Sequence, residues 1–393
     1  MFFYIYYMCI YTYWEKSMSV SNLHHEREKI LVLGAAGKTG YATARELLNR
    51  GELVRAFVHG KSDRSNALLA AGAEIFVGDM SDYEDVSKSL TEISKAYFVA
   101  PWVPEQLHIA ATFAAAAAKS ELSLIVAITQ WLAQPQHPSL ATRHSFLSDR
   151  LFEMLPGIDV VTINTGWFAD NFLQPGLLAM AAHLGIFPFP LGEGRTAPVS
   201  NEDMGRVAAE ALVNPRPYVG KLVRPTGPEL MSPKELADAL GRAAGRKVRF
   251  NNISERLFLK AMCFMGMSVH MQAQVRRYVE EYRRGSFEMG APNNVVLDMT
   301  GKAAEDFESI ARRYIKHHAS ITAPNLGNRL KAIGSFIRLA LTSQIDLDKF
   351  EKYRDYPLPA NPTYSIESTA WIQSHDKQHQ GVRPSDNLMH SSA

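Results

Sequence analysis

Short apolar runs alternate with amphipathic stretches along the first 165 residues of the chain. Apolar runs of about four to eight residues, bounded by polar or turn-forming ones, are typical of buried strands in a parallel sheet. The stretches between them have helical length, including an alanine-rich segment at 105–119. The expected strands cover residues 30–33, 53–58, 73–77, 96–99, 122–128 and 159–163. This alternation predicts an α/β fold with a Rossmann-type, doubly wound parallel sheet.

The later part of the chain is mostly helical in pattern. Ser200 and Ser232 each stand three residues before an acidic residue, which is the capping-box pattern and predicts helices over 200–212 and 232–245. Residues 255–285 also read as helical and are rich in Met, Phe and Arg. We therefore expect a smaller, mostly helical C-terminal substrate domain beside the sheet.

Two features of segment 255–285 allow more than one interpretation. Met262, Met265 and Met271 are suited to the floor of a pocket, although core packing is the commoner role of such residues. The arginine pairs at 276–277 and 283–284 are expected on a solvated helix face.

The predicted organisation has four parts. They are an extension at 1–28, a nucleotide-binding core at 29–165 with contributions from about 196–228, a substrate or partner region at 166–320, and a C-terminal helix and tail at 321–393. We expect the extension to be disordered. We also expect the tail to be flexible, because Pro, Ser, His and Asn dominate from about residue 355.

The first fourteen residues, MFFYIYYMCIYTYW, are apolar but too short to span a bilayer. They also lack the basic start and small-residue cleavage site of a secretory signal. A disordered extension, a start placed before Met18 and a weak interfacial anchor all remain open, and we expect no stable membrane span.

Charge and cysteine content exclude some classes of function. The 42 basic and 40 acidic residues give no overall field that favours nucleic acid or an anionic membrane, so we expect no direct nucleic-acid binding. Two cysteines provide no disulfide framework, which favours a cytoplasmic location. No cluster shows metal-ligand spacing, and we predict no metal.

The glycine-rich stretch GAAGKTG at 34–40 predicts a dinucleotide site. A triphosphate loop would need a glycine at Val32, inside the first strand, so GKT is not the end of such a loop. Gly34, Gly37 and Gly40 instead follow a strand and precede a helix, which places free backbone N–H groups against a pyrophosphate. Ala36, Lys38 and Thr39 lie between these glycines and are assigned to the same site.

At this point the sequence resembles the NmrA-like family, atypical members of the short-chain dehydrogenase/reductase superfamily. The resemblance covers about 29–315 and rests on the order and spacing of several segments. These are GAAGKTG at 34–40, GAEIFVGDMSD at 72–82, GIDVVTINTGWFADNFL at 157–173, SNEDMGRVAAEALVNP at 200–215, GKLVRPTGPELMSPKELADAL at 220–240 and MTGKAAEDFESIARRYI at 299–315. The family implies a Rossmann domain with a smaller, mostly helical substrate domain.

Charge after the second strand favours NADP(H) over NAD(H). Proteins that bind NAD usually place an acid about 20 residues past the glycines, where it holds the ribose 2′-hydroxyl. Here His59 occupies that place, followed by Lys61 and Arg64, and this basic group attracts a 2′-phosphate. Asp63 is the one acidic residue in this stretch and could lie near the ribose, so NAD(H) remains an alternative.

The resemblance also implies further cofactor contacts after the third to sixth strands. Asp79 and Met80 match the adenine edge, and Ala100 and Pro101 the nicotinamide ribose. Around the nicotinamide it implies Thr129, Gln130, Thr165, Gly166, Trp167 and Phe168, although core packing is a competing role for the two aromatic residues.

This sequence departs most from the superfamily in its catalytic residues. Reductases of the superfamily use Tyr-x-x-x-Lys to donate a proton, and the sequence contains no such pair. His144 lies in the corresponding stretch and is a candidate proton donor, or else a ribose ligand or helix cap. Thr129 stands where active reductases usually place a serine and is a second candidate.

Two functions from different classes follow from these observations. The first is an NAD(P)H-dependent oxidoreductase that acts on a small carbonyl or quinone substrate. The second is a non-catalytic NADP(H)-binding redox sensor that acts through a regulatory protein partner.

Overall fold

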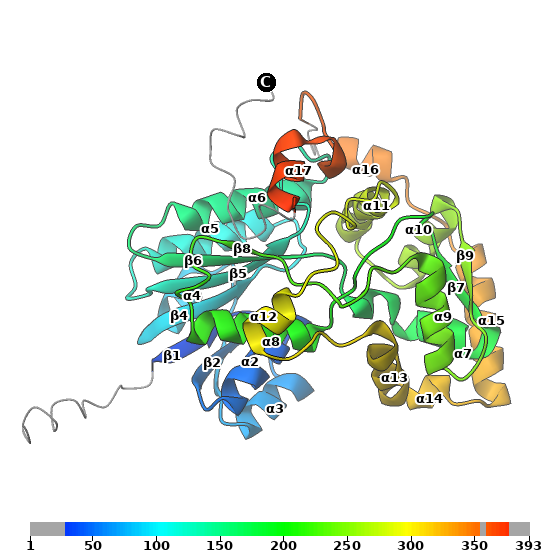
Figure 1. Cartoon of the computed structure of the whole chain (residues 1–393), viewed down its shortest axis with the longest axis horizontal. Helices are drawn as coiled ribbons and strands as arrows, with labels where there is room; N and C mark the ends of the chain where they lie inside the picture. Colours follow the sequence, from blue (N-terminus) through cyan, green and yellow to red (C-terminus); the bar gives the residue numbers. More distant parts are fainter. Residues whose placement is uncertain (1–27, 354–358, 377–393) are drawn as a thin grey trace, which may run out of the picture.

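The computed structural model describes residues 28–353 and 359–376, and the expected N-terminal extension lies outside them. The chain forms an α/β body around a large sheet and a mostly helical part beside it (Figure 1). The Rossmann-type prediction is confirmed.

All seven strands of the large sheet are parallel, in the order β3-β2-β1-β4-β5-β6-β8. The chain crosses over between β3 and β4, which is the topological switch of a doubly wound sheet. The strands are β1 (Lys29–Val32), β2 (Leu53–Val58), β3 (Glu74–Val77), β4 (Ile93–Val99), β5 (Leu124–Gln130), β6 (Asp159–Thr165) and β8 (Leu222–Val223). The six strands expected from the apolar runs are all present.

Helices cover both faces of this sheet (Figure 1). One face packs on α2 (Lys38–Asn49), α3 (Asp63–Ala70), α8 (Asn201–Val213) and α12 (Val295–Thr300). The other face packs on α4 (Tyr83–Ser89), α5 (Gln106–Ala117) and α6 (Leu140–Glu153). Because both faces are covered, the strands carry apolar residues on both sides, which explains their continuous apolar runs.

The helical part has its own core around Trp167, Phe172 and Tyr282 and contains a small parallel sheet of β7 (Ile186–Phe189) and β9 (Arg249–Asn252). Its helices are η1 (Ala169–Phe172), α7 (Pro175–Leu184), α9 (Pro233–Ala243), α10 (Glu255–Phe264), α11 (Val269–Arg283), α13 (Phe307–His317), α14 (Ala319–Thr322), α15 (Leu326–Leu341) and α16 (Leu347–Tyr353). The helix predicted over 255–285 is two helices, α10 and α11. Gly266 breaks it with a φ of 71°, and Ser268 caps α11 by accepting from the Met271 amide.

Both serine caps form, with one difference. Ser232 and Glu235 make a complete capping box at the start of α9. Ser200 accepts from the Asp203 amide, but the Asp203 carboxylate turns to Arg206 and to the Glu305 amide instead of closing the box.

A segment at 359–376 packs on the body, contrary to the flexible tail predicted from about residue 355. It contains η2 (Ser365–Glu367) and α17 (Thr369–His375), and Trp371 is buried against Trp131, to whose carbonyl oxygen it donates at 3.1 Å. The apolar anchor Trp371 outweighs the polar composition of its neighbours. The rest of the predicted tail, at 354–358 and 377–393, lies outside the described residues.

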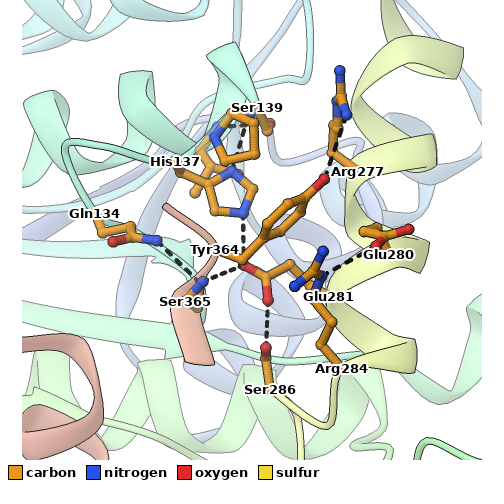
Figure 2. Close-up of polar contacts among 12 residues, drawn as sticks. Gln134, His137, Ser139, Arg277, Glu280, Glu281, Arg284, Ser286, Tyr364 and Ser365 are labelled. Atoms are coloured by element: carbon orange, nitrogen blue, oxygen red, sulfur yellow. Dashed lines mark hydrogen bonds and ion pairs between the residues drawn. The ribbon is translucent and has the colours of Figure 1, made fainter. Parts of the chain in front are cut away.

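The arginines of α11 were expected to be solvated. This prediction is wrong for Arg276 and Arg277, which are half-buried, whereas Arg283 and Arg284 are exposed. Arg276 pairs with Asp348 and Glu351, and Arg277 also pairs with Glu351. Figure 2 shows Arg277 at the hydroxyl end of Tyr364, to which it donates, and Arg284 lies over the Tyr364 ring. The sequence pattern could not identify the side chains that these arginines contact, because they lie some 70 to 90 residues later in the chain.

A buried histidine–glutamate pair holds segment 359–376 on the body (Figure 2). His137 Nε2 donates to Glu281 Oε1 at 2.7 Å, and both side chains are fully buried. The His137 Nδ1 accepts from the Ser139 amide, so the ring is neutral with its proton on Nε2. Glu281 Oε1 also accepts from the Ser365 amide at 2.6 Å, which joins η2 to α11.

Candidate cofactor and substrate site

The glycine turn joins β1 to α2 in the form that a pyrophosphate requires. Gly34 has a φ of 65°, a conformation that other residues rarely adopt. A Cβ on Gly40 would lie 2.3 Å from the Gly34 carbonyl oxygen, so this glycine allows the helix to approach the turn. The helix begins at Lys38, and Gly37 precedes it without a side-chain cap. Its first N–H groups are therefore left for a ligand.

The residues proposed to recognise a 2′-phosphate gather beside this turn. Arg64 donates from Nη1 to the Ala36 carbonyl oxygen at 3.1 Å and lies over the Tyr41 ring. His59 and Lys61 are exposed in the loop that joins β2 to α3. A phosphate on the ribose would meet at least one guanidinium next to the glycine turn.

The two residues predicted at the adenine edge differ in environment. Asp79 is exposed, and hydrogen bonds from the Ser81 amide and hydroxyl, followed by the charge of His59, lower its pKa. Its carboxylate is therefore ionised at neutral pH and able to accept a hydrogen bond. The half-buried Met80 side chain packs against the core beneath α4 and α5.

A cavity of about 830 Å³ extends from the glycine turn into the helical part. Lys38 and Thr39 line its end at the turn. Its sheet side is formed by residues at the ends of β4, β5 and β6: Val99, Ala100, Ile128, Thr129, Gln130, Thr165 and Gly166. Strand ends of a doubly wound sheet are where dinucleotides bind. The residues predicted after β4, β5 and β6 line this cavity, except Pro101.

Three cavity-lining side chains carry buried polar atoms with no hydrogen-bond partner among the described residues. These atoms are Trp167 Nε1, Gln130 Nε2 and Gln106 Oε1. A buried polar group without a partner is costly, so such atoms mark places where a ligand makes the missing bond. Two donors and one acceptor suit a ligand with carbonyl or carboxamide groups, such as a nicotinamide.

Thr129 is held so that its own proton is free for a ligand. Its hydroxyl accepts from Asn164 Nδ2 at 2.5 Å, and it lines the cavity. Thr165 Oγ1 donates to the Thr129 carbonyl oxygen at 3.2 Å, which fixes the two strand ends together. The hydroxyl of Thr129 is a hydrogen-bond donor directed by its neighbour.

His144 lies on α6 but is not among the residues that line the cavity. Ser145 and Ser148 present that face of the helix instead. Burial lowers the pKa of His144, with smaller effects from Arg143 and His270, and its Nδ1 is buried with no partner among the described residues. A role in proton transfer thus stays a prediction.

Lys38 makes a contact that the sequence did not predict. Its ammonium pairs with Asp170, a buried carboxylate on η1. This ion pair joins the start of α2 to the helical part at the mouth of the cavity. Asp170 lies in the GWFADNF segment, but nothing in that pattern indicates its partner.

The far end of the cavity is apolar and aromatic. Met262, Met265 and Met271 all line it, as the pocket-floor interpretation required. Trp102 and Tyr278 add a wall with ring centroids 5.5 Å apart, and Trp167 stacks on Phe172 at 5.2 Å. Tyr278 is buried, which raises the pKa of its phenol and keeps it protonated. Neither Trp102 nor Tyr278 was predicted, because no motif marks them.

Comparison with known proteins agrees with this geometry. The model of the NmrA-like family matches residues 26–126 and 156–304. The chain belongs to the NmrA-like family. The match ends before α13, α15 and the 359–376 segment, which extend this NmrA-like chain beyond the shared part.

Its relatives include both reductases and a regulator. The chain is 30% identical over 240 residues to an NAD(P)H azoreductase of Xenophilus azovorans, a match that covers 61% of this chain and 82% of that protein. Its fold is similar to that of the NADPH complex of quinone oxidoreductase QOR2 from Escherichia coli, with a TM-score of 0.63 at 18% identity, covering 72% and 99% of the two chains. The NADP complex of NmrA, a negative transcriptional regulator, gives 0.61 at 15% identity, covering 76% and 99%. These two structures support the NmrA-like fold alone.

No helix within 28–353 or 359–376 is long and apolar enough to cross a membrane.

Proposed function

We propose that this NmrA-like protein is an NADPH-dependent reductase of flat, conjugated apolar substrates, with quinones as the leading class. The observation that carries the proposal is a single cavity in which a glycine turn and an aromatic, methionine-rich chamber are continuous. A protein that only senses the redox state of its cofactor needs the turn but has no use for the chamber.

The residues present fit the cofactor. The turn offers helix N–H groups, and Arg64 lies beside it. Gln130 at the end of β5 offers a donor, and Gln106 at the start of α5 offers an acceptor. When bound, NADPH supplies a hydride, so that a quinone gains two electrons and, with one proton, becomes a hydroquinone. NAD(H) is the weaker alternative because no acid stands at the end of β2.

The chain's own residues orient the substrate and stabilise its oxygens. Aromatic walls and methionines hold a flat ring and exclude water. The hydroxyl of Thr129 and the indole N–H of Trp167 are donors for a quinone oxygen as negative charge develops on it. A hydroquinone anion is a weak base, so this chemistry tolerates the absence of a tyrosine–lysine pair. The cytoplasmic location is part of this proposal, since NADPH is available there.

A redox sensor is the second candidate. It is favoured by the missing tyrosine–lysine pair and by the position of His144 outside the cavity. A regulatory protein partner would then bind one cofactor state in preference to the other.

The decisive test is consumption of NADPH with a panel of naphthoquinones and benzoquinones, and with short aliphatic aldehydes as controls. We expect turnover with the quinones and little with the aldehydes, which fill the apolar chamber poorly. Tight NADPH binding with no turnover of any member of the panel would favour the sensor.

A further inference from the structure

Helix α15 has two different apolar faces. Its inner face buries Ala332 and Leu339, which line the cavity. Its outer face carries large aliphatic side chains that are between 38% and 78% exposed: Leu326, Leu330, Ile333, Ile337 and Leu341. These positions are three or four residues apart, so at about 3.6 residues per turn they form one continuous stripe.

Basic residues flank this stripe on both sides. By helical geometry, Arg329 lies along one edge and Arg338 lies along the other, and both are exposed. Lys331 is also exposed, but it lies further round the helix and lines the cavity. Residues 326–345 contain no acidic side chain. On the neighbouring α10, Lys260 adds a further cation, which donates to the Ala340 carbonyl oxygen at 2.7 Å. The chain is close to neutral overall, so this concentration of positive charge is local.

We propose that α15 is an interfacial helix that docks this protein on an anionic membrane surface. An exposed apolar stripe with basic flanks is the pattern of helices that lie in the plane of the lipid headgroups. The aliphatic side chains enter the acyl boundary, and the two arginines contact anionic headgroups.

Charge favours lipid over a second copy of the chain as the occupant of this face. In a twofold dimer the same patch faces itself, which would bring the basic flanks of both helices together without acids between them. An anionic headgroup can pair with each of these cations instead.

Docking through α15 also explains why one helix borders both the outside and the cavity. The inner face would form a wall of the substrate chamber directly above the membrane surface, and a lipid-soluble substrate would have a short path into it. This consequence rests on the proposed reductase function, whereas the docking itself does not.

The test is cosedimentation of the full chain with phosphatidylcholine vesicles, with and without phosphatidylglycerol. We expect binding only to the anionic vesicles, weakening as salt is added. The double change L330E and I337E should lower vesicle affinity at least about tenfold, because it places acids within the stripe. Arg338→Gln alone should lower it about fivefold, the contribution of one basic residue at an anionic surface.

Leu69→Glu is the matched control, since Leu69 is 60% exposed on α3 and outside the stripe. It should bind vesicles as the unchanged chain does. Equal vesicle binding by the double variant, or a wild-type dimer that the double variant converts to a monomer in sedimentation equilibrium, would overturn the proposal. Cofactor affinity and turnover of a water-soluble quinone should be unchanged in the double variant, so these readouts keep the docking claim separate from the reductase claim.

Discussion

At the scale of single residues, the site is defined by hydrogen bonds that the protein leaves unmade. The indole N–H of Trp167 and the side-chain Nε2 of Gln130 are buried in an apolar cavity without partners among the described residues. The sequence placed both near the nicotinamide through the family resemblance. It could not show that their donors were unused, because this depends on which neighbours the fold brings near.

Thr129 and His144 are the two catalytic candidates that the sequence suggests. Thr129→Val keeps the shape and removes the hydroxyl, and we expect a fall in kcat of about 10²-fold, the lower range for such a group. His144→Ala should change kcat by less than about threefold, because its side chain does not line the cavity. Steady-state kinetics with one quinone compares the two. A large loss in His144→Ala with an unchanged Thr129→Val would reverse the assignment.

Substitutions at Gly37 and Gly40 should have different effects, the first on cofactor binding and the second on stability. Gly37→Val fills the space that the pyrophosphate needs, and we expect a folded protein that no longer binds NADPH. A Cβ at position 40 would lie 2.3 Å from backbone, so Gly40→Ala should lower stability by about 1–3 kcal/mol. Thermal melting and calorimetry separate the effects. Normal NADPH affinity in Gly37→Val would show that the phosphate lies elsewhere.

At the scale of elements, the sequence predicted those features that depend on residues close together in the chain. The buried strands, the Ser232 capping box and the glycine turn form as expected, since each depends on residues a few positions apart. The packing of 359–376 on α11 was missed, because its contacts join residues more than 70 positions apart. Its polar composition predicted a flexible tail, but the buried side chain of Trp371 holds the segment on the body.

The His137–Glu281 pair predicts that acid weakens the attachment of 359–376. Burial lowers the pKa of His137 below its usual 6.5. Burial pushes the pKa of Glu281 upward, but hydrogen bonds from His137, Ser286 and Ser365 outweigh it, and the net shift is downward. Both groups bind fewer protons in the folded state than in the unfolded state. Their stabilisation is therefore present above the unfolded pKa values and is lost as the pH falls, first for His137 below 6.5.

Hydrogen exchange of the Ser365 amide, which donates to Glu281, measures this directly. We expect its protection to fall between neutral pH and pH 5, after correction for the intrinsic exchange rate, while amides of the central strand β5 keep theirs. In Glu281→Gln the protection should be lower at neutral pH and less dependent on pH. Constant protection across this range would contradict the role given to the pair.

At the scale of the whole molecule, cofactor choice depends on basic residues that follow β2 and lie beside the glycine turn that follows β1. Lys61→Ala and Arg64→Ala should each weaken NADPH binding about tenfold or more, the contribution of one charge-assisted hydrogen bond, and leave NADH binding nearly unchanged. Lys119→Ala, an exposed lysine just after α5, is the control. Calorimetry with both cofactors gives the comparison. Equal affinities of the unchanged protein for NADPH and NADH would contradict the preference.

The central claim is that cofactor and substrate meet in one cavity and that hydride passes between them. The most direct measurement is an anaerobic single turnover, in which protein loaded with one equivalent of NADPH is mixed with a naphthoquinone. The account predicts that the absorbance of the bound NADPH disappears with formation of one equivalent of hydroquinone, and more slowly when its transferable hydrogen is deuterium. NADPH that stays bound and unoxidised beside a bound quinone would contradict the account.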